Sequence, residues 1–166
     1  MSLTEMTLDR DEHPVDMIER LAASHEWAFE RSGPDEISIS VSGAWTNYSA
    51  AFSWLDDLEA LHLGCAFDLK VPDRRRGETA KLIALINEQL WVGHFDLWSK
   101  EHVVMFRHSL LLSNGLEPGQ GQCEDLLRIA AQTCERYYQA FQFVVWAGKS
   151  AREALDSAMF DTAGEA

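Results

Sequence analysis

The sequence predicts an α+β fold in which one antiparallel sheet packs against helices. Two segments, residues 37–42 and 61–70, alternate between apolar and polar or small side chains, which is typical of strands with one buried face. The strands gather into groups and do not alternate one by one with helices, which favours this class over a doubly wound fold. The predicted order is helix, four strands, helix, two strands, a long helix and a short helix.

The first half of the chain holds the first helix and the four strands. A helix is expected at 14–25, because Pro14 suits a first helical turn, where its missing N–H would be unpaired anyway. Strands follow at 27–31, 37–42, 47–54 and 61–70, joined by short turns, as in an antiparallel meander. The predicted inward face carries Ile37, Ile39, Val41, Leu61, Leu63, Cys65, Phe67 and Leu69.

The second half begins with a helix at 75–90. Its expected apolar stripe is Ala80, Ile83, Ile86 (or Leu82) and Leu90. A hairpin formed by 94–100 and 102–112 is expected to turn at Lys100–Glu101. The loop at 115–122 contains three glycines and a proline, and it precedes a long helix at 124–147. Gly148 breaks this helix, and a short helix is expected at 151–160.

The long helix carries two apolar stripes, so it must be buried on two sides. The first consists of Leu127, Ala131, Cys134, Tyr138, Phe141 and Val145, and the second of Leu126, Ile129, Tyr137, Ala140 and Val144. The second stripe is covered either within the fold or by a second copy of the chain. Because exposed tryptophans would also need cover, we predict a homodimer. The expected partner or dimer surface comprises Trp91, Trp98, Tyr137, Val144 and Trp146.

Length and charge set limits on the organisation and on the partners. The 166 residues fit one domain, expected at 14–160, with a flexible N-terminus at 1–13 and a tail at 161–166. The 14 basic against 27 acidic residues give a net charge of −13, which disfavours nucleic-acid and membrane partners. Three widely spaced cysteines and no secretory or membrane-spanning segment predict a cytoplasmic protein.

We find no pattern typical of catalytic, cofactor-binding or metal-binding residues. His102 and His108 would lie roughly 20 Å apart on one strand, with His94 on the other face, so they could not share an ion. Cys65 alternates with core residues and is interpreted as a small hydrophobe. Cys123 lies near a helix start, but two neighbouring carboxylates oppose its activation.

The run Arg74–Arg76 is the main basic cluster of the sequence. It could bind an acidic partner, or it could pair with Asp73 and Glu78 as a solvated helix start. We favour the solvated interpretation, although three cations at a helix N-terminus oppose the helix dipole.

Four stretches carry a resemblance to a known family. They are Gly43–Trp45, residues 61–68 (Leu-His-Leu-Gly-Cys-Ala-Phe-Asp), residues 82–87 (Leu-Ile-Ala-Leu-Ile-Asn) and residues 93–98 (Gly-His-Phe-Asp-Leu-Trp). Over roughly 14–147 the chain resembles the YbjN family of bacterial proteins, described as sensory transduction regulators. The resemblance implies a fold similar to the type III secretion chaperones, usually dimeric, and carries over no set of functional residues. The extra C-terminal helix departs from those chaperones and argues against a cargo-wrapping role.

The function that we favour is a non-catalytic protein-interaction module, chaperone-like or regulatory. It would bury a peptide or partner helix against an aromatic-rich surface, because six Trp, eight Phe and three Tyr occur with no reactive chemistry nearby. The alternative is a small-molecule sensor or an unrecognised enzyme with a pocket between the sheet and the long helix. Nucleic-acid binding is a more remote idea, which the net charge opposes.

Overall fold

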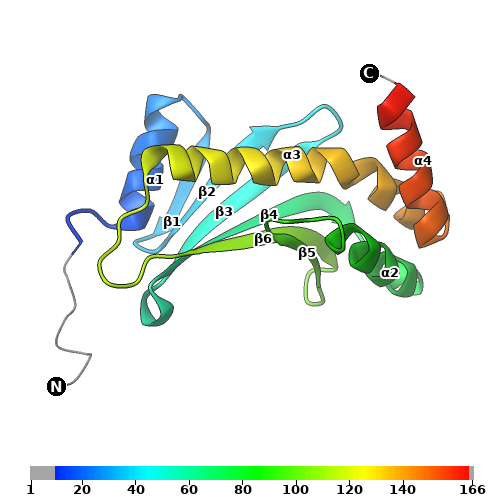
Figure 1. The fold of residues 1–166 in the computed structure, drawn as a ribbon, viewed down its shortest axis with the longest axis horizontal. Coiled ribbons are helices and arrows are strands. Elements are labelled where there is room, and N and C mark those ends of the chain that lie inside the picture. The colour runs from blue at the N-terminus through cyan, green and yellow to red at the C-terminus, as the bar shows by residue number, and fades with distance from the viewer. Residues whose placement is uncertain (1–9, 165–166) are drawn as a thin grey trace.

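The computed structural model describes residues 10–164, and side chains from 10 to 160 (Figure 1). Residues 1–9 of the expected flexible N-terminus, and residues 165 and 166 of the expected tail, lie outside this description. The elements are α1 (Pro14–Ser24), β1 (Phe29–Gly33), β2 (Glu36–Ser42), β3 (Asn47–Leu55), β4 (Ala60–Lys70), α2 (Arg76–Asn87), β5 (His94–Trp98), β6 (Val103–Leu111), α3 (Gln120–Val145) and α4 (Ala151–Gly164). Two short 3-10 turns, η2 (Asp56–Leu58) and η3 (Asp73–Arg75), follow β3 and β4.

The described strands form one six-stranded sheet in the order β1-β2-β3-β4-β6-β5, and every neighbouring pair is antiparallel. The α+β prediction is therefore confirmed, including the meander from β1 to β4. The pairing register aligns Ile39, Ala50, Cys65, Phe106 and Phe95 in one row across five strands. All five side chains are at most 1% exposed, so this row marks the buried face of the sheet.

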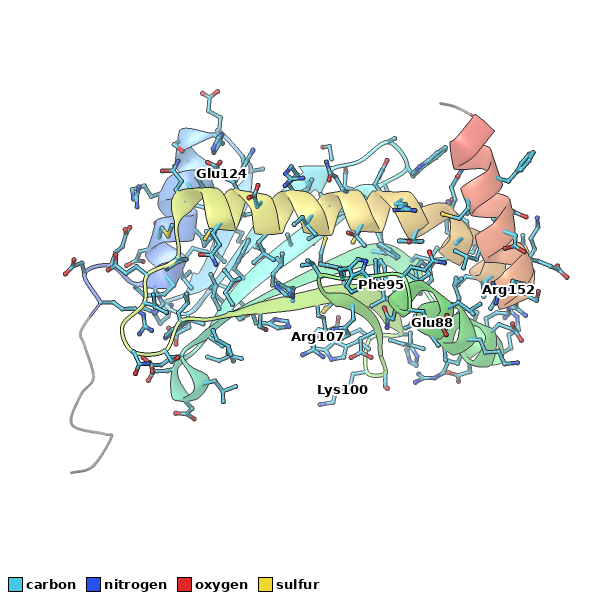
Figure 2. All side chains as sticks on the ribbon, in the orientation of Figure 1. Glu88, Phe95, Lys100, Arg107, Glu124 and Arg152 are labelled. Atoms are coloured by element: carbon cyan, nitrogen blue, oxygen red, sulfur yellow. The ribbon has the colours of Figure 1, made fainter. Side chains whose placement is uncertain are left out.

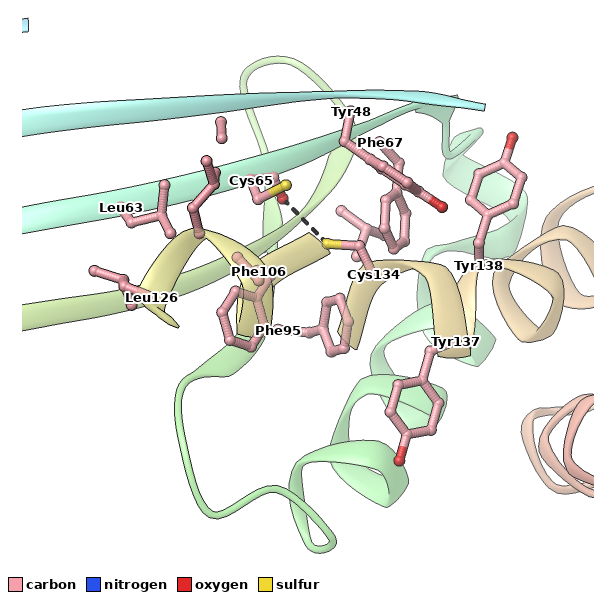
Figure 3. Packing of buried hydrophobic residues seen from close by; sticks show 14 of the residues in the cluster. Tyr48, Leu63, Cys65, Phe67, Phe95, Phe106, Leu126, Cys134, Tyr137 and Tyr138 are labelled. Carbon is pink, nitrogen blue, oxygen red and sulfur yellow. Dashed lines mark hydrogen bonds between the residues drawn. The ribbon is translucent and has the colours of Figure 1, made fainter. Parts of the chain in front are cut away.

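Helix α3 crosses this buried face, with α1 beside its N-terminal end and α2 and α4 at its C-terminal end (Figure 1). Aromatic rings from both layers meet between them (Figure 3). The ring of Phe67 lies 5.4 Å from Tyr138 and 5.3 Å from Phe141, both on α3. Edge-to-face contacts of this kind contribute roughly 0.5–1.5 kcal/mol beyond the buried area.

Apart from the half-buried Ile129 and Ala131, both stripes of α3 are buried within the monomer, which corrects part of the predicted surface. Tyr137 is 1% exposed and Val144 is 0% exposed, so neither side chain is available to a partner. Tyr137 donates its hydroxyl hydrogen to the Gln89 side chain at 3.3 Å, and α2 and α4 cover this side of the helix. The second stripe therefore needs no second subunit.

Three helices differ from the predictions, either in their bounds or in the side chains that they bury. Helix α3 begins at Gln120, four residues before the expected start. Its first turn is polar, so the apolar period of the sequence did not mark it. The Gly119 N–H donates a hydrogen bond to the Gln122 side chain at this end of the helix. In α2 the buried residues are Thr79, Leu82 and Ile86, while the expected Ala80 is exposed. Helix α4 continues to Gly164, four residues past the expected end at Phe160.

Strands β1 and β6 both begin later in the chain than expected. Strand β1 begins at Phe29, two residues late, because the Trp27 N–H donates to Ala22 O of α1 at 2.9 Å. The β5–β6 hairpin has the expected register, with Phe95 opposite Phe106. His102 lies in the turn, with φ of +56°, and not in β6.

A candidate binding groove along the long helix

A groove runs along the N-terminal two thirds of α3, on the side that faces the end of β2. It consists of two adjoining hollows of about 620 and 550 Å³, which share Val41, Ser42 and Ala131. One wall is α3; the other consists of the end of β2 with the segment before β1 and the β2–β3 turn. We call these the Trp27 hollow and the Trp45 hollow, after a tryptophan in each.

The Trp27 hollow lies where α1, β2 and the start of α3 meet. Its lining residues are His25, Glu26, Trp27, Ala28, Ser40, Val41, Ser42, Glu124, Leu127, Arg128 and Ala131. The rings of His25 and Trp27 stack at 4.5 Å, and His25 Nε2 lies 3.0 Å from Glu124 Oε1 (Glu124 is labelled in Figure 2). This hydrogen bond lowers the pKa of the Glu124 carboxyl. An apolar floor with a charged rim is suited to binding an apolar group with a polar end.

The Trp45 hollow is shaped by one carboxylate. Glu135 on α3 accepts a hydrogen bond from the Ala44 N–H at 2.7 Å and another from the Tyr48 hydroxyl. Burial, followed by this bond, raises the pKa of Tyr48. A Cβ at Gly43 would clash with the Glu135 carboxylate and the Tyr48 ring, so glycine is required where the turn approaches α3. Trp45 beside it is 48% exposed.

Strand β2 ends in a free edge inside the groove. Strand β1 pairs with β2 only as far as Ile39, and the Ser40 N–H then donates to Ala28 O at 3.0 Å. Successive residues of an antiparallel strand direct their backbone groups to alternate sides. Ser42 therefore directs its N–H and C=O to the side of Ala28, where the chain has turned away to α1 and no described strand pairs with it.

Comparison with known proteins places this architecture in a family. A family model named YbjN, described as "Putative bacterial sensory transduction regulator", matches residues 14–143. The chain belongs to the YbjN family. All residues that line the groove fall inside the range matched by YbjN, whereas α4 lies beyond it.

One solved structure similar to this chain is described as "Crystal structure of YbjN, a putative transcription regulator from E. coli". The TM-score is 0.53 at 11% sequence identity, and the match covers 73% of this chain and 85% of that chain. The likeness shows a shared YbjN fold. No curated protein gives a significant match.

The sequence-predicted surface residues lie apart from the groove. Trp91 is 100% exposed before β5, Trp98 is half-exposed at the end of β5, and Trp146 is 63% exposed after α3. Sequence reasoning missed the groove residues Trp45 and Glu135, although Trp45 belongs to one of the stretches that carried the YbjN resemblance. Only the tertiary fold brings the turn to Glu135, 91 residues away from Ala44.

Burial shifts the pKa of two cysteine thiols and of one histidine in the part of the chain that the structure describes. Burial, and then Glu124, raise the pKa of Cys123 to about 11, and burial also raises the pKa of Cys134. His62 accepts a hydrogen bond from Arg107 Nε at 3.1 Å, and burial and this cation lower its pKa. Among the described side chains, from 10 to 160, no group of three His, Cys, Asp or Glu residues is placed to hold a metal ion.

Even α3, with 26 residues, lacks the apolar character needed, and no other helix within the described range has the length and apolar character to cross a bilayer.

Proposed function

We propose that this member of the YbjN family is a non-catalytic regulatory module, chaperone-like in its mode of action, which binds a peptide segment of a partner protein in the groove along α3. The observation that carries the proposal is the position of the free β2 edge at Ser42 between two tryptophan-lined hollows. Backbone pairing at a strand edge gives affinity, and flanking side-chain pockets give specificity, in many peptide-binding domains.

The charge of the groove narrows the kind of peptide. Arg128 is already paired with Asp125 at 3.1 Å, and Arg136 lies over the Tyr137 ring at 5.4 Å. Glu124 and Glu135 supply carboxylates at the two hollows, and the whole chain has a net charge of −13. We therefore expect an extended, apolar peptide with a neutral or positive charge, since complementary charge favours encounter and register.

Selection from a random peptide display library, with the purified chain as bait, tests this proposal. Bound peptides should lose at least about tenfold in affinity for Ala131→Arg, which fills the centre of the groove, because the new side chain displaces them. Ala80→Arg, on the exposed face of α2, is the matched control and should leave affinity unchanged. Equal binding to both variants would contradict the proposal.

A second candidate function, a small-molecule sensor, rests on the Trp27 hollow alone. Its volume of about 620 Å³ falls within the range of roughly 300–1,000 Å³ found for small-ligand sites. It also lies between the sheet and the long helix. A thermal-shift screen against metabolites would support this candidate if a compound stabilises the wild type but not Ala131→Arg.

Homodimer formation and a cytoplasmic location complete the proposal. Because Tyr137 and Val144 are internal, we assign the dimer contact to the edge strand β5, which pairs only with β6 in the described chain. Exposed Trp91 precedes this strand, and exposed Trp98 ends it. Light scattering should give about twice 18.8 kDa for the wild type and a monomer mass for Trp98→Glu. A monomeric wild type would contradict the dimer.

The proposed cytoplasmic location rests on the cysteines. The three buried free thiols favour a reducing compartment.

A further inference from the structure

A separate hollow of about 490 Å³ lies at the C-terminal end of α3, where it meets the end of β4. Three segments distant in sequence form its wall. The lining residues are Lys70, Val71, Pro72, Asp73, Arg74, His102, Val145 and Trp146. None of these residues lines the groove described above.

Hydrogen bonds between the segments preform this hollow. Arg75 Nε donates to Val144 O at 2.8 Å, and an NH2 of the same guanidinium donates to Lys149 O at 2.6 Å. Arg75 thereby satisfies carbonyls at and beyond the C-terminal end of α3 and fixes the helix end against the turn η3. On the other side, the Val71 N–H donates to His102 O at 2.7 Å and holds the β5–β6 turn. The solvated interpretation of Arg74–Arg76 was therefore wrong for Arg75.

Two cations that line the hollow have no carboxylate partner among the described residues. Lys70 and Arg74 are these two cations. By contrast, five arginines elsewhere lie within 3.1 Å of a carboxylate oxygen, namely Arg10, Arg20, Arg31, Arg107 and Arg128. Asp73 is the carboxylate in the lining; it is 87% exposed and lies 3.9 Å from His102 Nδ1. On a chain of charge −13, this local excess of positive charge favours an anion.

An aromatic side chain lies beside these cations. Trp146 is 63% exposed, and it adjoins the apolar Val71 and Val145. An exposed indole offers its face to a flat ring, and stacking of a nucleobase on an aromatic side chain is a common source of affinity.

We propose that this hollow binds a small nucleoside phosphate. The phosphate groups lie against Lys70, Arg74 and His102, and the base stacks on Trp146. The volume of about 490 Å³ suits a mononucleotide. A nucleic-acid strand is disfavoured because the net charge of −13 repels its successive phosphates.

ADP is the probe for the test, titrated into the full chain at low ionic strength and followed by calorimetry. Millimolar or tighter binding is expected. The double variant Lys70→Gln/Arg74→Gln should weaken it at least about tenfold, because two charge-assisted contacts are lost. Trp146→Ala should weaken it at least about fivefold through loss of stacking. Phe160→Ala, which removes an exposed aromatic ring on α4 outside this hollow, should leave affinity unchanged.

Three outcomes would overturn the inference. They are no binding at millimolar ADP, tripolyphosphate binding as tightly as ADP, and a single-stranded oligonucleotide binding more tightly than ADP. Circular dichroism of each variant verifies its fold. Ala131→Arg should leave ADP affinity unchanged, so this site and the proposed peptide groove succeed or fail independently.

Discussion

The Tyr48 hydroxyl donates a hydrogen bond to the Glu135 carboxylate, and this bond joins β3 to α3 across 87 residues of sequence. Tyr48 is 2% exposed, so its hydroxyl depends on this acceptor. The same carboxylate accepts a hydrogen bond from the Ala44 N–H at 2.7 Å, and this bond fixes the β2–β3 turn against the helix. Glu135 therefore couples the stability of the fold to the shape of the Trp45 hollow.

Glu135→Leu should destabilise the protein by about 1–3 kcal/mol, because it leaves the Tyr48 hydroxyl and the Ala44 N–H without their acceptor. Urea denaturation measures the change. Glu88→Leu, at an exposed position after α2, is the control and should change stability by less than about 0.5 kcal/mol. A loss at Glu135 no larger than that of the control would show that the bond contributes little.

The environment of Tyr48 also predicts a dependence of stability on pH. Burial, then the Glu135 hydrogen bond, raise its pKa above the ordinary value of 10. Above pH 10 the unfolded chain releases this proton more readily than the folded chain. The contribution is therefore complete below pH 10 and is lost as the pH rises above it. Tyr48→Phe should flatten the decline in unfolding free energy between pH 9 and 11, and parallel curves for the two proteins would rule out this linkage.

The sheet face can be tested with one pair of substitutions on β2. Ile39 is 1% exposed on the buried face, whereas Ser40 beside it is exposed. Ile39→Asp should prevent folding, because it buries an unpaired carboxylate in the core. Ser40→Asp should cost under about 0.5 kcal/mol. Far-ultraviolet circular dichroism distinguishes the two, and a folded Ile39→Asp variant would contradict the assigned faces.

Local pattern explains what the sequence could predict. The serines that alternate with Ile37, Ile39 and Val41 specify which face of β2 is buried, because side chains of a strand point alternately to opposite faces. The two stripes of α3 likewise show that it is buried on two sides. They do not show what covers the second stripe, and α2 and α4 cover it within the same chain.

Long-range contacts explain what the sequence could not predict. No local signal in Arg74–Arg76 shows that Arg75 donates to Val144 O, 69 residues away. The groove depends in the same way on contacts of Glu135 with Ala44 and Tyr48. Trp27 was expected in a strand, whereas its backbone bond to Ala22 places it in the groove wall.

The six tryptophans allow the most direct test of peptide binding in the groove. Each indole N–H gives a separate signal in a ¹⁵N-correlated spectrum, which Trp→Phe variants assign. On titration with a peptide selected from the library, the signals of Trp27 and Trp45 should move, and those of Trp91 and Trp146 should stay. Movement of Trp91 or Trp146 with Trp27 and Trp45 unchanged would contradict the groove as the binding site.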